Sequence, residues 1–160
     1  CFAGQSWEWD GVRFEMLHPA WESYADKRLK DNARGCTLKI TSPYGSVLLP
    51  ADIEREAEAE VLARSPDALA ATLLVAPHHG SKTSSTEAFI RQINPSIVIF
   101  TAGYRNPFGH PRPEVVERYR ALGSRMYRSD ADGAVLLRFE KEEGVKLQTW
   151  RQERRRYWQG

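Results

Sequence analysis

Two adjacent histidines, His78 and His79, stand between an apolar run and a stretch rich in hydroxyl groups. They occur in APHHGSKTSS, directly after LAATLLV, and are two of the four histidines in the chain. Neighbouring side chains on extended backbone point to opposite sides, so both can face one site only where the chain turns. Gly80 permits that turn. Imidazole binds Zn²⁺, Mn²⁺ or Fe, contacts phosphates and acts as a general acid; the alternative is one structural and one exposed histidine.

The residues after His79 carry groups that attract an anion. The stretch GSKTSS leads into a predicted helix, and the free N–H groups at a helix start favour negative charge. Hydroxyl groups and one ammonium group add further donors. The spacing of a Walker loop is absent. An ordinary polar helix cap is the alternative. The predicted anion-binding residues are Ser81, Lys82, Thr83 and Ser84.

Two further loops carry chemically competent groups. Asp52, in VLLPADIE, either caps the following helix or presents its carboxylate to a site at the end of an apolar strand. The loop TAGYRNPFGHPRPEV offers Asn106 and His110 as donors to a phosphate oxygen, or is a rigid connector with a surface histidine. His18 has no polar companions, and we expect it to be structural. One Asp, two adjacent His, a hydroxyl-rich cradle and a further His indicate metal-assisted hydrolysis of a phosphate ester.

These residues depend on strands and helices that alternate along the chain. The pattern predicts layered α/β or α+β packing, with polar loops after residues 49, 76 and 102 that each follow an apolar strand. Asp10-Gly11 indicates a tight hairpin. Expected strands lie in 6–17, 35–52, 68–77, 95–103, 125–129, 133–140 and 144–151. Expected helices lie in 52–65, with Asp52 as cap, in 84–94, with Ser84 or Ser85 as cap, and in 112–123.

The composition fits one globular domain. The chain has 160 residues and a formal net charge of +2, too small to indicate an acidic partner by itself. Its last ten residues, 151–160, form a basic and aromatic tail that either contacts phosphates or is a solvated end. No apolar run approaches the ~20 residues of a membrane span.

The chain starts at Cys1 rather than Met, and we expect it to be a piece of a larger protein. Two cysteines admit one disulfide or two separate buried thiols.

The strings LLPADIE, VAPHHGSKTSS and AGYRNPFGHPRPEV resemble the end of a metallo-β-lactamase-fold domain. The similarity is to the C-terminal hydrolase domain of ComEC-type DNA-internalisation (competence) proteins, and CFAGQSWEWDGVRFEMLHP and DNARGCTLKI share it. It covers roughly residues 1–140. The resemblance implies a four-layer αββα sandwich with two divalent metals, Mn²⁺ or Zn²⁺, between its sheets. The main metal motif of that family, HxHxDH, is absent, so we expect residues 1–160 to be the C-terminal portion of one such domain.

The resemblance also implies roles for individual residues. Asp52 would bridge the two metals and His79 would complete a metal shell, while His78 and His110 would act on the substrate phosphate. One carboxylate and three histidines are too few for two ions, so further ligands must come from the upstream half. The residues expected to bind the substrate phosphate are Ser81, Lys82, Thr83, Ser84, Asn106 and Arg112.

The implied protein is a bacterial inner-membrane DNA-uptake channel with this domain outside the cytoplasm. That setting favours a disulfide between Cys1 and Cys36. The expected function is a metal-dependent DNase that degrades the non-transported strand, and the piece alone is expected to be inactive and either to expose an apolar face or to dimerise. Three positions depart from the family pattern: Ala51 replaces Gly, Gly35 replaces Ser and Arg112 replaces His. They leave open a non-catalytic DNA-guiding module, and a hydrolase of the same fold acting on another phosphoester is a further alternative.

Overall fold

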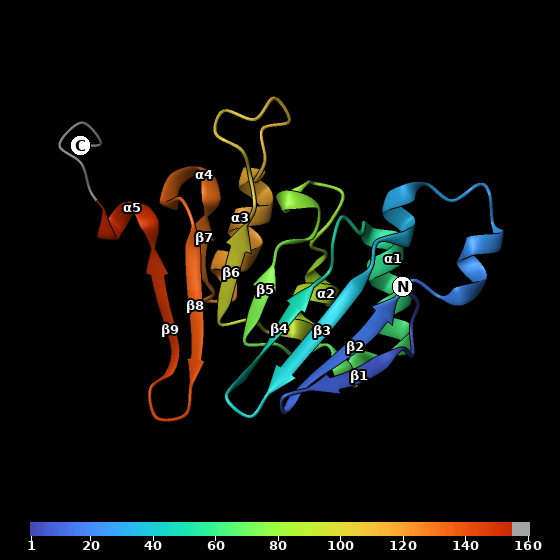
Figure 1. Ribbon diagram of the computed structural model, residues 1–160. Coiled ribbons are helices and arrows are strands. Elements are labelled where there is room, and N and C mark those ends of the chain that lie inside the picture. Colours follow the sequence, from blue (N-terminus) through green and yellow to red (C-terminus); the bar gives the residue numbers. More distant parts are fainter. Residues whose placement is uncertain (155–160) are drawn as a thin grey trace.

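The computed structural model describes residues 1–154 and consists of a seven-stranded sheet, a two-stranded sheet and helices (Figure 1). Residues 155–160 of the predicted basic tail lie outside the described residues. The strands are β1 (Ser6–Trp9), β2 (Val12–His18), β3 (Thr37–Ser42), β4 (Gly45–Leu49), β5 (Leu73–Val75), β6 (Ile97–Phe100), β7 (Arg125–Arg128), β8 (Val135–Glu140) and β9 (Gly144–Thr149). The α-helices are α1 (Arg55–Arg64), α2 (Glu87–Ile93), α3 (Pro113–Ala121), α4 (Ser129–Asp132) and α5 (Trp150–Glu153). Short 3₁₀ helices cover Trp21–Ala25, Asp31–Arg34, Pro66–Ala68 and Pro77–Gly80.

The seven strands of the large sheet lie side by side in chain order. Strands β1 to β4 pair antiparallel, and β4 to β7 pair parallel. The β1–β2 hairpin turns at Asp10-Gly11, where both residues have positive φ, as the sequence predicts. The carboxyl ends of β4, β5 and β6 therefore meet at one edge, and the loops that follow them can share a site there.

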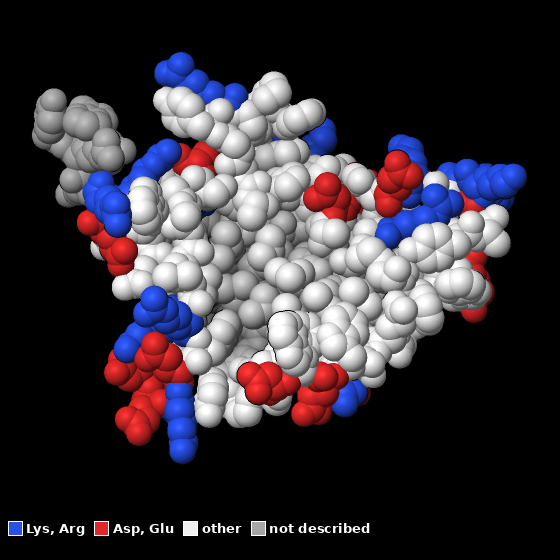
Figure 2. Space-filling model, in the orientation of Figure 1, with Lys and Arg blue, Asp and Glu red and all other residues white. Residues whose placement is uncertain are grey.

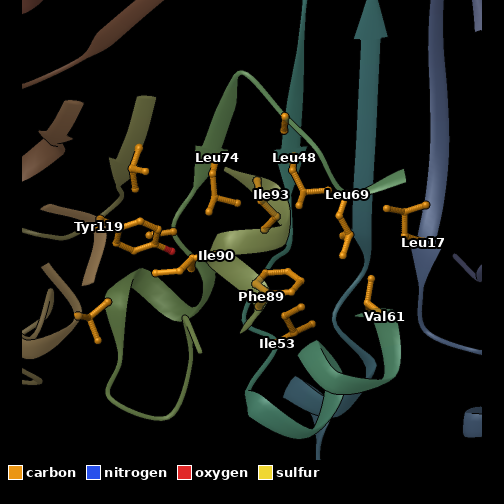
Figure 3. Close-up of a cluster of buried hydrophobic side chains, with 14 of the residues drawn as sticks. Leu17, Leu48, Ile53, Val61, Leu69, Leu74, Phe89, Ile90, Ile93 and Tyr119 are labelled. Carbon is orange, nitrogen blue, oxygen red and sulfur yellow. The ribbon is translucent and has the colours of Figure 1, made fainter. Parts of the chain in front are cut away.

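Helices α1, α2 and α3 cover one face of the sheet and close the main core with it (Figures 1 and 3). Phe89, Ile90 and Ile93 of α2 are buried against sheet residues such as Leu48 and Leu74. Each fully buried side chain of this kind contributes about 1.5–3 kcal/mol relative to exposure. The mixed α/β architecture expected from the sequence is therefore present, with one helical layer behind one large sheet.

The opposite face of the sheet is apolar but only partly covered. The β8–β9 hairpin packs over β5 to β7, where its Val135, Leu137 and Phe139 meet Leu73 and Ile97. Over β1 to β3 the face is open, and its cross-strand rows are apolar: Trp7, Phe14 and Ile40 in one, which ends at Val47 beside the hairpin, and Met16, Leu38 and Leu49 in the next. Figure 2 shows this face, with charged side chains at its rim and a largely uncharged, hollowed centre.

Two of the predicted helix caps are wrong. Helix α1 begins at Arg55 with Glu54 as its cap residue, so Asp52 lies outside the helix. Helix α2 begins at Glu87 with Thr86 before it, so neither Ser84 nor Ser85 is the cap residue. The physical reason in the second case is that a distant carboxylate, described below, already satisfies the N–H groups of Ser85 and Thr86. The segment 18–34 between β2 and β3 contains two short 3₁₀ helices.

Within residues 1–154, no helix combines the length and the apolar character needed to cross a membrane.

Candidate active site

Three loops meet at the carboxyl ends of the parallel strands: 50–54 after β4, 76–86 after β5 and 101–112 after β6. Backbone hydrogen bonds tie them together. The N–H of His78 donates to Ala51 O at 3.1 Å, and the N–H of Arg112 donates to Gly80 O at 3.0 Å. The N–H of Arg55 donates to Thr83 O at 3.0 Å. The three loops are therefore held in register by their main chains, independently of any ligand.

The turn that the two histidines require is made by the histidines themselves. His78 has φ 47° and ψ 41°, and His79 has φ 56° and ψ 18°, both in the left-handed region. Gly80 follows with φ 82°, and a Cβ there would lie 2.7 Å from Pro111 Cβ. A non-glycine residue in this region is disfavoured by roughly 1–2 kcal/mol, and such strain clusters at functional sites. The loop thus holds two imidazoles in a conformation that the backbone alone disfavours.

His79 faces Asp52. Its Nε2 lies 3.5 Å from Asp52 Oδ1, and its Nδ1 lies 3.0 Å from Thr101 Oγ1. Both the His79 and Asp52 side chains are about half exposed, each with 45 % of its side-chain surface accessible. The pair brings one nitrogen and one oxygen donor together at an open surface, while Thr101 fixes the ring from the other side.

His78 and His110 complete a cluster of three imidazoles. Their ring centroids are 5.8 Å apart, and those of His78 and His79 are 6.3 Å apart. His78 Nδ1 lies 3.2 Å from Glu54 Oε1, close enough for an ion pair when the ring is protonated, although no hydrogen bond forms. Burial lowers the pKa of His110, and the positive charge of His78 and then of Arg112 acts in the same direction. Its Nδ1 is buried and finds no hydrogen-bond partner among the described residues, 1–154.

The predicted phosphate-binding residues do not all present free donors. Asn106 uses its amide within its own loop: Nδ2 donates to His110 O at 2.7 Å and to Gly103 O at 3.2 Å. Ser84 is buried, and its Oγ donates toward Pro77 O at 2.8 Å. Ser81 Oγ lies 3.0 Å from Thr83 Oγ1, and Lys82 is exposed. Lys82 is thus the exposed donor of the set, the Thr83 hydroxyl is shared with Ser81, and the buried Nε of Arg112 has no hydrogen-bond partner within residues 1–154.

The anion at the start of α2 is supplied by the protein. Glu58 of α1 is fully buried, and its carboxylate accepts hydrogen bonds from the N–H groups of Ser85 and Thr86, the second at 2.8 Å. Arg118 of α3 donates to Ser85 O at 2.9 Å, and Tyr119 donates to Ser85 Oγ at 2.9 Å. Burial raises the pKa of Glu58, partly offset by these hydrogen bonds. Glu58 therefore positions the hydroxyl-rich loop and occupies the helix start that the sequence suggested for a phosphate.

Sequence reasoning missed Glu54, Glu58 and Thr101. Thr101 follows the next parallel strand, so its place at the strand end is a signal that was available. Glu58 lies on the same buried stripe of α1 as Ala57 and Val61, and a charge within an apolar stripe calls for a buried partner. Glu54 carries no comparable signal, because only the turn at His78 brings the two side chains together.

Ala51 and Gly35 lie close together near Asp52. Ala51 has φ 54°, a conformation that favours glycine, and its Cβ would lie 3.4 Å from a Cβ placed at position 35. Such a Cβ would also lie 2.9 Å from Ile53 Cγ2. The contact with Ala51 would be an ordinary one, so Ile53 rather than Ala51 is the close neighbour that a side chain at position 35 would meet. The neighbouring Cys36 forms a disulfide with Cys1, with their Cα atoms 6.0 Å apart.

Asp52 and His79 suit a divalent metal as two donors of an incomplete set. Imidazole nitrogen and carboxylate oxygen are ordinary ligands of Zn²⁺ and Mn²⁺, and a separation of 3.5 Å allows both to bind one ion. Among residues 1–154, no three His, Cys, Asp or Glu side chains come together as a metal site. Asp52 and His79 are therefore two donors, fewer than a metal site needs.

Comparison with known proteins finds bacterial relatives of the chain. No protein-family model matches the chain. The competence protein ComA of Neisseria gonorrhoeae is 34% identical over 149 residues, which are 93% of this chain and 21% of ComA. The chain is homologous to part of a competence protein. The uncharacterized protein YcaI of Escherichia coli strain K12 is 31% identical over 96% of the chain and 20% of its own length. Recombination protein 2 of Haemophilus influenzae is 32% identical over 87% of the chain and 17% of its own length. The chain therefore spans about a fifth of the length of these relatives.

Proposed function

We propose that this chain is part of a metal-dependent phosphodiesterase, a DNase that acts during DNA uptake by a competence protein. The observation that carries the proposal is the Asp52–His79 pair, held at 3.5 Å by a left-handed turn at the end of β5. The relationship to competence protein ComA supports the biological role. On this proposal the enzyme degrades the strand that is not transported while the other strand enters the cell.

The roles of the residues follow from their positions. Asp52 and His79 would hold divalent metal, Mn²⁺ or Zn²⁺, and Thr101 would orient the ring of His79. Two bound metals would supply a hydroxide nucleophile at neutral pH and clamp the phosphodiester. His78 and His110 face the same space from two loops and would donate a proton to the leaving oxygen or stabilise its charge. Lys82, Thr83 and Arg112 would bind the phosphate oxygens.

A complete site requires ligands from outside these 160 residues, and the open sheet face supports a place for them. The apolar rows over β1 to β4 would pack against a second sheet from an upstream half, giving an αββα sandwich of the metallo-β-lactamase type with its metals between the sheets. In the chain alone this face would be exposed or covered by a second copy. The whole protein would sit in the inner membrane of a bacterium, with this domain outside the cytoplasm.

The test is Asp52→Ala in the full-length protein, with Asp67→Ala, an exposed carboxylate on the Pro66–Ala68 helix, as the matched control. We expect Asp52→Ala to abolish nicking of DNA and Asp67→Ala to leave it unchanged. Metal analysis should find about two Mn²⁺ or Zn²⁺ per wild-type chain and fewer in Asp52→Ala. Undiminished nicking in Asp52→Ala would reject the assignment.

A second candidate is a non-catalytic module that guides DNA. It is favoured by Arg112, which stands where the family pattern has a metal-binding histidine and which cannot ligate a metal. The affinity of such a module for DNA would fall steeply with salt, and no metal would support cleavage. A hydrolase of the same fold acting on another phosphoester would cleave a small phosphodiester while leaving DNA intact.

A further inference from the structure

The loop after β6 carries exposed aromatic rings that the phosphodiesterase proposal does not use. We call residues 103–110 the aromatic loop; it projects from the carboxyl edge of the sheet (Figure 1). Tyr104 is 70% exposed and Phe108 is 68% exposed. Large aromatic side chains normally lie in a core, and exposed ones grouped on one loop mark a binding surface.

The aromatic loop is braced from within. Asn106 Nδ2 donates to Gly103 O and to His110 O, and its Oδ1 accepts the His110 N–H at 2.9 Å. Gly109 N–H donates to Asn106 O at 3.2 Å. One amide side chain thus joins the two ends of the loop. The aromatic rings at its tip are therefore presented by a defined scaffold rather than by an unsupported segment, which lowers the entropy lost when they bind a ligand.

A row of rings connects the tip of the loop to the candidate active site. Phe108 stacks nearly parallel to His110, with centroids 5.9 Å apart and planes at 16°. His110 lies 5.8 Å from His78, and His78 lies 6.3 Å from His79. The outer end of the row is solvent-exposed, and its inner end faces Asp52.

A cation accompanies the rings. The guanidinium of Arg105 lies 5.2 Å from the centroid of the Tyr104 ring, and Arg105 is exposed. Aromatic faces beside a positive charge are the combination that binds single-stranded nucleic acid, because bases stack on the rings and phosphates pair with the cation. Duplex DNA hides its base faces within its own stack, so these rings suit unpaired bases.

We propose that the aromatic loop is a base-stacking site for single-stranded nucleic acid, in which Tyr104 and Phe108 hold unpaired bases and Arg105 contacts a neighbouring phosphate. This inference rests on the proposed function, since the row of rings would lead the bound strand to the Asp52–His79 pair. Aromatic rings with arginine also suit a membrane interface. A membrane would contact only the tip, whereas a nucleic acid strand accounts for the continuous row from Phe108 to His79.

The test measures binding of labelled oligonucleotides by the full-length protein in EDTA, so that cleavage plays no part. The ligands are a single strand, the matching duplex and an abasic strand that keeps the sugar–phosphate chain without bases. The variant is Tyr104→Ala/Phe108→Ala. Its matched control is Trp9→Ala/Tyr44→Ala, which removes two exposed aromatic rings elsewhere. Tyr104→Trp/Phe108→Trp keeps the stacking surface.

We expect the double alanine variant to bind the single strand about 10- to 100-fold more weakly, as loss of base stacking predicts. Its affinity for the duplex and the abasic strand should stay unchanged, and the control and the tryptophan variant should bind the single strand as wild type does. Equal wild-type affinity for the normal and abasic strands, or an unaffected double alanine variant, would overturn the proposal. The proposal would also be overturned if the double alanine variant lost binding to anionic phospholipid vesicles but still bound the single-stranded oligonucleotide.

The failure of this inference can be separated from failure of the proposed function. Asp52→Ala should lose nicking but bind the single strand as wild type does. If Asp52→Ala still nicks DNA while the double alanine variant loses binding, the phosphodiesterase assignment fails and the base-stacking site stands. If nicking depends on Asp52 while the double alanine variant binds the single strand normally, the base-stacking site fails and the phosphodiesterase assignment stands.

Discussion

At the scale of single residues, the backbone at His78 and His79 stores strain in the candidate active site. Two left-handed non-glycine residues in succession persist only because the surrounding structure holds them. The hydrogen bonds from His78 N to Ala51 O and from Arg112 N to Gly80 O supply that hold. The backbone conformation favours glycine at both positions. The imidazole side chains are therefore the reason that histidine stands there.

This strain predicts a difference between two variants that both remove the imidazole of His79. Glycine adopts the left-handed conformation without strain, whereas alanine at position 79 is strained in the same way as histidine. We therefore expect His79→Gly to be more stable than His79→Ala by about 0.5–1 kcal/mol. Urea unfolding of both variants measures the difference. Both should lose metal binding equally. A glycine variant no more stable than the alanine variant would show that the turn is not strained.

Burial of His18 makes a second prediction at this scale. His18 is fully buried, and its Nε2 lies 2.9 Å from Ala33 O, in agreement with the structural role expected from the sequence. Burial lowers its pKa, so the unfolded chain binds its proton more readily than the folded chain does. The contribution of neutral, buried His18 to the free energy of unfolding is therefore fully present above its pKa in the unfolded chain, about 6.5. That contribution is lost as the pH falls toward the lower pKa of His18 in the folded chain.

His18→Gln should therefore flatten the pH dependence of stability just below pH ~6.5. Thermal unfolding at several pH values measures it, and Glu60→Gln, which removes the carboxylate 3.9 Å from His18 Nδ1, serves as a comparison. Because the Glu60 charge raises the pKa of His18, its removal should steepen the dependence. An unchanged slope in His18→Gln would show that other groups govern this pH range.

At the scale of elements, a buried carboxylate on α1 fixes the loop before α2. Glu58→Ala would leave the N–H groups of Ser85 and Thr86 buried without partners, and we expect a loss of about 2–4 kcal/mol in the free energy of unfolding. The matched control is Glu56→Ala, an exposed position in the same helix, which should change stability by less than about 0.5 kcal/mol.

The pH dependence gives this prediction a second readout. The pKa of Glu58 is raised in the folded chain, so its contribution is full below the unfolded pKa and diminishes as the pH rises through the folded pKa. The difference between wild type and Glu58→Ala should accordingly be larger at acidic than at neutral pH. A difference that grows with pH would contradict the raised pKa.

The elements themselves were largely predictable, and the caps were not. The apolar runs predicted β4, β5 and β6, and Asp10-Gly11 predicted the first hairpin, because those signals are local. The start of α2 depends on Glu58, 28 residues before Thr86, and such a contact leaves no local signal. The sequence predicted that Asp52 and His79 lie at the same edge of the sheet. It did not predict the left-handed turn that brings their side chains together.

At the scale of the whole molecule, a covalent link joins the start of the chain to β3. The disulfide between Cys1 and Cys36 closes a segment with a sequence separation of 35 that contains the β1–β2 hairpin and two 3₁₀ helices. Closing a loop of this length stabilises the folded chain by about 3–4 kcal/mol in the chain-entropy view. The segment that precedes the candidate active site is thus tied directly to the sheet.

Reduction of this disulfide should lower the midpoint of urea unfolding by an amount that corresponds to about 3–4 kcal/mol. Cys1→Ser/Cys36→Ser should show the same lower stability with and without a reductant, which separates loss of the bond from other effects of the reagent. Wild-type protein with the same midpoint in both conditions would mean that the bond is absent in solution or carries no stability.

The brace made by Asn106 has a consequence for how the molecule can change over evolution. Because one amide side chain holds both ends of the aromatic loop, the residues at its tip take little part in folding. Tyr104 and Phe108 can therefore be exchanged for other side chains at small cost to stability, while exchange of Asn106 disturbs the whole loop. Natural variation in ligand preference should accumulate at the tip and spare the brace.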